Sequence, residues 1–135
     1  MNRRRLPGKL FQVLPDPACT RLAVELRTES PRQARFGVLT LPELAPVADA
    51  FEGPEAYWCS LLAHWPEGLL LGGYHPTDMP IAGGLYLYSG DGAQRWARPD
   101  LALAHYLPAG PLARAVGGPW QRLDPSTGRT LATLS

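Results

Sequence analysis

Cysteine is scarce in this 135-residue sequence, and its scarcity excludes a framework of disulfides. Cys19 and Cys59 are the only two, and their spacing matches no CxxC pattern of a zinc or redox site. We predict two buried, reduced thiols, and a single disulfide is the alternative that the spacing leaves open.

Excess charge of either sign and long apolar runs are also lacking. The 13 basic residues, of which Lys9 is the only lysine, are balanced by 12 acidic residues. Balanced charge gives no electrostatic signature of nucleic-acid or anionic-membrane binding, so we predict neither partner. No run approaches the roughly 20 apolar residues that span a bilayer. The basic residues 1–9 precede an apolar run too short for a signal peptide, so we expect a cytoplasmic protein.

Glycine and proline, by contrast, are abundant. The 14 glycines and 15 prolines are spread along the chain, which is typical of many tight turns rather than of disorder. Hydrophobic residues make up 45% of the sequence, enough for a core, and 135 residues is the length of one domain. We therefore predict a single globular domain over residues 1–135.

The clearest local signal is a β-hairpin over residues 82–99. Asp91 and Gly92 lie between two runs rich in aromatic and apolar residues. Both residue types tolerate the positive φ that a tight hairpin turn requires. The pattern predicts antiparallel strands over residues 84–89 and 94–97.

Alternation of apolar and polar residues predicts most of the other strands, because a half-buried strand has a period of two. Leu22, Val24 and Leu26 share one face, for example. Further strands are expected at 10–14, 35–41, 45–51, 69–71, 102–107, 112–116, 120–124 and 130–133. Residues 58–65 also have helical spacing, but their length and aromatic content favour a strand. Residues 75–82 are expected to form a loop.

These hairpins recur along the chain. Their turns centre near residues 43, 91 and 127, which is close to the period of about 40 to 50 residues of propeller blades. A small twisted sheet cannot bury both faces alone, so such blades stack face to face. We predict an all-β fold, a partial β-propeller of about three four-stranded antiparallel blades over residues 10–51, 56–98 and 101–134. A closed antiparallel β-barrel with a small-ligand cavity is the alternative.

Residues 84–96, Gly-Leu-Tyr-Leu-Tyr-Ser-Gly-Asp-Gly-Ala-Gln-Arg-Trp, resemble the repeat of pyrroloquinoline-quinone-type and WD40-like propellers. Residues 120–131 carry the same Asp-x-x-x-Gly turn without the closing tryptophan. The order of segments also resembles an uncharacterised bacterial family of propeller-like repeat proteins, which implies a fold and no activity. Propellers usually have four to eight blades. Self-association of two copies into a complete ring is therefore one expectation, and a truncated form or an open arc are the others.

Motifs of catalysis and metal binding are missing. There is no G-x-S-x-G, no HExxH, and no glycine pattern that cradles a phosphate. His64, His75, Asp78 and His105 are the only candidate metal ligands, and no recognised spacing links them. We predict no metal site, no cofactor and no catalytic residue.

Aromatic residues carry the functional hypothesis. We predict that a groove or central channel binds a ligand through Trp58, Tyr74, His75, Asp78 and Trp96. The competing interpretation is that aromatic side chains fill the space between blades. The predicted function is a non-catalytic binding or interaction module with a protein or small-molecule partner. The alternative is a small enzyme or metal-binding protein with a site near Tyr74 and Asp78.

Overall fold

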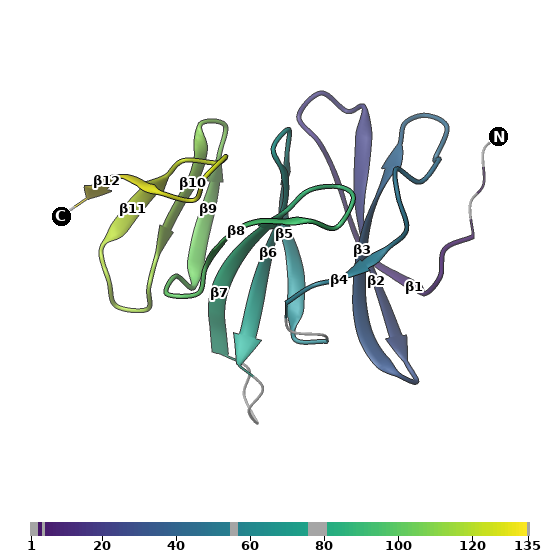
Figure 1. Cartoon of the computed structure of the whole chain (residues 1–135), viewed down its shortest axis with the longest axis horizontal. Helices are drawn as coiled ribbons and strands as arrows, with labels where there is room; N and C mark the ends of the chain where they lie inside the picture. Colours follow the sequence, from purple (N-terminus) through teal and green to yellow (C-terminus); the bar gives the residue numbers. More distant parts are fainter. Residues whose placement is uncertain (1–2, 4, 55–56, 76–80, 135) are drawn as a thin grey trace.

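The structure, a computed structural model, describes residues 3, 5–54, 57–75 and 81–134. These residues form twelve strands in three separate four-stranded antiparallel sheets, which stand side by side along the long axis (Figure 1). The fold is all-β, a partial propeller of three blades, as predicted. Each sheet has two edge strands and none closes on itself, so the alternative of a closed barrel is wrong. Among the described residues, no helix is long and apolar enough to cross a membrane.

Every sheet is a simple meander in which strands adjacent in sequence are hydrogen-bonded neighbours. The first sheet contains β1 (Lys9–Pro15), β2 (Arg21–Glu29), β3 (Arg32–Thr40) and β4 (Phe51–Glu52). The second contains β5 (Cys59–Trp65), β6 (Gly68–His75), β7 (Ile81–Tyr88) and β8 (Gln94–Arg98). The third contains β9 (Leu103–Leu107), β10 (Gly110–Arg114), β11 (Trp120–Leu123) and β12 (Thr130–Leu134).

The predicted hairpin at residues 82–99 is confirmed as β7 and β8. The amide of Ser89 donates to the carbonyl of Ala93 at 2.8 Å, and the amide of Gly92 donates to the carbonyl of Ser89 at 3.0 Å. Gly92 has a φ of +94°, which is the backbone conformation that favoured glycine at this turn. Of the predicted strand at residues 58–65, residues 59–65 form β5, which packs one face on the first sheet and is too short for a stable amphipathic helix.

One predicted strand and one predicted loop differ from the structure. Residues 45–51 were expected to be a strand, but only Phe51 and Glu52 pair with β3, and Pro46 makes a single isolated bridge to Leu39. That segment contains three alanines and one proline, and neither residue type supports a continuous ladder. The expected loop at residues 75–82 is shorter, since His75 pairs with Ile81 and extends both β6 and β7. Residues 76–80 lie outside the described residues.

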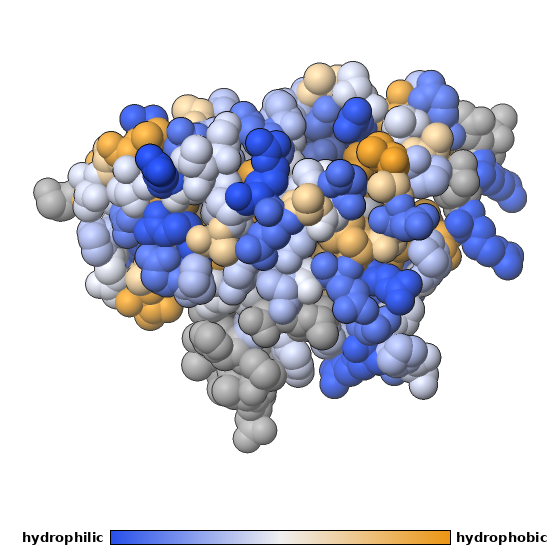
Figure 2. All heavy atoms as spheres, in the orientation of Figure 1, coloured by the Kyte–Doolittle hydropathy of each residue, from blue (hydrophilic) through white to orange (hydrophobic). Residues whose placement is uncertain are grey.

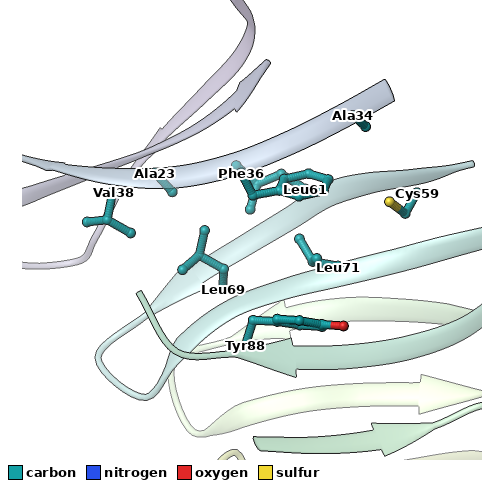
Figure 3. Packing of buried hydrophobic residues seen from close by; sticks show 9 residues of the cluster. All are labelled: Ala23, Ala34, Phe36, Val38, Cys59, Leu61, Leu69, Leu71 and Tyr88. Carbon is teal, nitrogen blue, oxygen red and sulfur yellow. The ribbon is translucent and has the colours of Figure 1, made fainter. Parts of the chain in front are cut away.

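Apolar side chains fill both spaces between neighbouring sheets. Figure 3 shows Phe36 and Val38 of the first sheet pointing toward Leu61, Leu69 and Leu71 of the second. Fully burying one such side chain stabilises the fold by about 1.5–3 kcal/mol. A second cluster, which includes Leu70, Leu87, Trp96, Ala113 and Leu123, joins the second sheet to the third. No disulfide links Cys19 and Cys59; Cys59 is buried as predicted, whereas Cys19 is exposed because it lies in the turn between β1 and β2.

The second and third sheets are held together at Trp96. This side chain is buried, and its indole Nε1 donates to the carbonyl of Pro125 at 2.9 Å. The ring lies against Gly128, where a Cβ atom would come within 2.6 Å of the ring atom Cδ2. Arg98 reinforces the same junction by donating from Nη1 to the carbonyl of Gly128 at 3.0 Å. The glycine of the Asp-x-x-x-Gly turn is therefore required by packing as well as by its positive φ.

We predict that Gly128→Ala destabilises the protein more than Gly117→Ala. Both glycines have positive φ, +74° and +77°, so each alanine carries a similar backbone cost of about 1 kcal/mol. Only at Gly128 would the added Cβ also collide with Trp96, since nothing lies within 4 Å at Gly117. The extra loss is expected to be about 1–3 kcal/mol of the free energy of unfolding, measured by urea titration. Equal losses would show that the contact with Trp96 does not constrain this turn.

Candidate functional site

Two of the predicted ligand-binding residues come together in the structure. Trp58 and Tyr74 line one cavity of about 300 Å³ at the junction of the first and second sheets, and the amide of Tyr74 donates to the carbonyl of Trp58 at 2.8 Å. We call this cavity the aromatic–arginine cleft; its lining residues are Phe11, Arg27, Tyr57, Trp58, Ser60 and Tyr74. The other predicted site residues are not part of it. Trp96 lies between the second and third sheets, and the side chain of His75 and all of Asp78 are outside the described residues.

The floor of the cleft is built on a buried ion pair. Glu25 of β2 is fully buried, and its Oε2 accepts hydrogen bonds from Nε and Nη2 of Arg27 at 2.9 and 2.7 Å. Its Oε1 accepts from the hydroxyl of Ser60 at 2.9 Å and from the amide of Leu61 at 2.7 Å. The carboxylate thus has four donors, which compensate for its removal from water.

Arg27 reaches from the first sheet to the second. Its Nη1 donates to the carbonyl of Tyr57 and its Nη2 to the carbonyl of Cys59, both at 2.7 Å. The guanidinium also lies 5.0 Å from the ring centroid of Phe11 and 4.7 Å from that of Tyr57. The N–H donors and the flat faces of the Arg27 guanidinium are thus occupied by contacts within the protein. We infer that Arg27 positions the aromatic rings of the cleft.

Arg32 differs from Arg27 because, among the described residues, aromatic rings are the only partners of its guanidinium. It lies at the start of β3, is exposed, and stacks 4.3 Å above the ring centroid of Tyr57 and 5.6 Å from that of Trp58. Tyr57 and Trp58 meet edge to face, with centroids 5.7 Å apart and planes at 88°. In the described part of the chain, no carboxylate or hydrogen-bond acceptor pairs with the Arg32 guanidinium. A free cation therefore stands beside two half-buried aromatic rings.

The cleft is lined by four aromatic rings, a guanidinium and one aliphatic hydroxyl, that of Ser60. This hydroxyl donates to Glu25, whose carboxylate is paired with Arg27. Of the candidate metal ligands, the side chains of His64 and His105 are described: Nδ1 of buried His64 lies 3.0 Å from the carbonyl of Leu14, and His105 packs against Trp120 in the third sheet. Among the described residues, no three His, Cys, Asp or Glu side chains are grouped to hold a metal.

Sequence reasoning missed Phe11, Arg27 and Arg32. Arg27 ends an alternating run, where a charged residue is ordinarily a solvated strand end. The signal that could have found these residues is the combination of arginines near the aromatic pair Tyr57–Trp58, but their proximity depends on how the two sheets pack. No family model, curated protein or solved structure matches this chain.

We predict that Glu25→Gln strongly destabilises the fold. The amide cannot neutralise Arg27, which would remain a buried cation against the second sheet. The expected loss is about 3–5 kcal/mol of the free energy of unfolding, measured by urea titration. Asp100→Asn is the matched control, because it breaks the exposed pair with Arg98, which is worth at most about 1 kcal/mol. A loss for Glu25→Gln no greater than that of the control would contradict the structural role of the pair.

Proposed function

We propose that the protein is a non-catalytic binding module, and that the aromatic–arginine cleft takes a planar ligand that carries a carboxylate. The observation that supports this proposal is the guanidinium of Arg32, which stacks on Tyr57 beside the cleft and has no acceptor among the described residues. A guanidinium offers two parallel donors that match the two oxygens of a carboxylate. An arginine kept only for solubility has no need of an aromatic platform.

The shape of the cleft favours a small, flat ligand. Its volume of about 300 Å³ lies at the lower end of the range of small-molecule sites. Phe11, Tyr57, Trp58 and Tyr74 supply rigid apolar surfaces, and aromatic rings gain about 0.5–1.5 kcal/mol from stacking beyond the area that they bury. Arg27 keeps two of these rings in place through its contacts with Phe11 and Tyr57. The site is therefore organised before any ligand arrives, which lowers the entropic cost of binding.

The proposal is tested with pairs of aromatic carboxylates and their uncharged amides. Indole-3-acetate and 1-naphthoate, with indole-3-acetamide and 1-naphthamide, are titrated while the indole N–H signal of Trp58 is followed by NMR. We expect the carboxylates to shift this signal and to bind more tightly than the amides. The variant Arg32→Gln should lower carboxylate affinity at least about tenfold and leave amide affinity unchanged, because a charged hydrogen bond is worth about 1.5–3 kcal/mol.

Arg122→Gln is the matched control for this experiment. Arg122 is an exposed arginine on β11 of the third sheet, so its loss changes the net charge equally without touching the cleft. If Arg122→Gln weakens binding as much as Arg32→Gln, the attraction is a property of the whole charge distribution. If no carboxylate shifts the Trp58 signal, the cleft is not a site for this class of ligand.

A further inference from the structure

β9 is an edge strand without the usual protection. It is the first strand of the third sheet, and among the described residues it pairs only with β10. Its sequence, Leu-Ala-His-Tyr-Leu, contains no proline, lysine, arginine or acidic residue. Leu103, Tyr106 and Leu107 are 39%, 47% and 40% exposed. Native proteins normally protect such an edge with charge, proline or a covering segment, because its free amides and carbonyls are a template for another strand.

The corresponding edge of the second sheet is covered. β5 is the first strand of that sheet, and side chains of the first sheet satisfy its outward backbone groups. Glu25 accepts from the amide of Leu61, Arg27 donates to the carbonyl of Cys59, and Gln12 donates to the carbonyl of Leu61 at 2.6 Å. In the described residues no side chain makes such a bond to the backbone of β9. β5 and β9 have equivalent places in the repeat, but the edge of β5 is covered by side chains of another sheet and the edge of β9 is not.

A groove follows β9 along its length. One cavity of about 180 Å³ lies between Leu62 and Tyr74 of the second sheet and Ala104 and Tyr106 of β9. A second cavity of about 530 Å³ continues from Leu62 and Tyr106 to Leu107. The two cavities share Leu62 and Tyr106, so they adjoin one another along β9. Among the described residues, no Asp, Glu, Lys or Arg lines either cavity. Figure 2 shows that hydrophilic residues cover much of the face in view, with apolar patches small and separated.

The side chain of Tyr106 is about half withdrawn from water. Burial raises the pKa of the Tyr106 phenol above its usual value, and the nearby phenol of Tyr74 adds to the shift. The wider cavity is lined at its far end by Trp65, Pro66 and Pro108, which are apolar and conformationally stiff. The groove therefore combines an apolar wall with a backbone edge that offers hydrogen bonds.

We propose that an extended, uncharged peptide segment of a partner protein binds in this groove and pairs with β9 as a fifth strand of the third sheet. The backbone ladder supplies affinity, and every second side chain of the peptide enters the apolar cavities. A charged segment would lose hydration in a groove that holds no opposite charge. This site differs from the proposed carboxylate site because it uses the backbone of β9 and no guanidinium, although Tyr74 lines both cavities.

The first test is a screen of the whole protein against immobilised nine-residue peptides with apolar residues at alternate positions and threonine between them. We expect micromolar binders, and we expect a bound peptide to slow hydrogen exchange of the amides of residues 103–107. N-methylation of the best binder should lower its affinity at least about tenfold at alternate positions only, because only every second amide of a strand faces its neighbour. No binder, or a binder insensitive to N-methylation, would overturn the proposal.

The second test uses two neighbouring variants, Ala104→Pro and His105→Pro. Alternate amides of β9 face β10 and the open edge, so one proline removes a ladder donor and the other removes only a free donor. The variant that keeps the native unfolding midpoint is expected to lose peptide binding at least about tenfold. If both unfold, the N-methylation pattern and the exchange data decide alone.

Two controls separate this site from the others. Arg32→Gln should leave peptide affinity unchanged, so the peptide site and the proposed carboxylate site can fail independently. Sedimentation of the protein over a range of concentrations tests whether a second copy occupies β9 instead. A concentration-dependent dimer that the tolerated proline variant abolishes would assign the edge to self-association and overturn the proposal of a partner peptide.

Discussion

The hydrogen bonds of Glu25 and Arg27 determine how the first two sheets fit together. A four-stranded sheet has two open edges and two faces, and apolar packing satisfies only the faces. Here the polar side chains of β2 reach the edge of β5 and form hydrogen bonds with the backbone of Cys59 and Leu61, and with that of Tyr57 just before the strand. Because these bonds are directional, they fix the register between the sheets, which apolar contacts alone leave free. The aromatic–arginine cleft is a consequence, since the same guanidinium positions its rings.

The two sheet junctions use different chemistry. Between the first and second sheets, a buried ion pair is combined with the apolar cluster around Phe36 and Leu61. Between the second and third, the indole donor of Trp96, a glycine that admits its ring and the partly exposed Arg98 join the sheets without a fully buried carboxylate. A buried ion pair contributes little net stability compared with apolar packing, but it is sensitive to the loss of either partner. The cleft therefore lies at the junction that tolerates substitution least.

The sequence was informative about strands and much less so about the site. The turn at Asp91 and Gly92 and the period-two runs are local signals, and local signals predicted the three sheets. The same rule fails for Glu25, which alternates with Val24 and Leu26 as a solvent-facing residue would, yet is fully buried. Period two tells which residues share a face but not whether the opposite face is covered as well. Trp96 shows the same limit, because an aromatic side chain suits a ligand site and a sheet junction equally.

A comparison of Arg27 with Arg114 shows that the cleft arises from a junction and not from the repeat itself. Arg27 pairs in register with Lys9, the first residue of β1, and Arg114 pairs with Leu103, the first residue of β9. Both guanidinium groups lie about 5 Å from an aromatic ring, that of Phe11 and that of Trp120. The guanidinium of Arg27 donates hydrogen bonds to carbonyls at the start of the following sheet. The buried Nε of Arg114, by contrast, has no hydrogen-bond partner among the described residues. The repeat therefore supplies an arginine beside an aromatic ring, and only an adjoining sheet turns that pair into an ordered cleft.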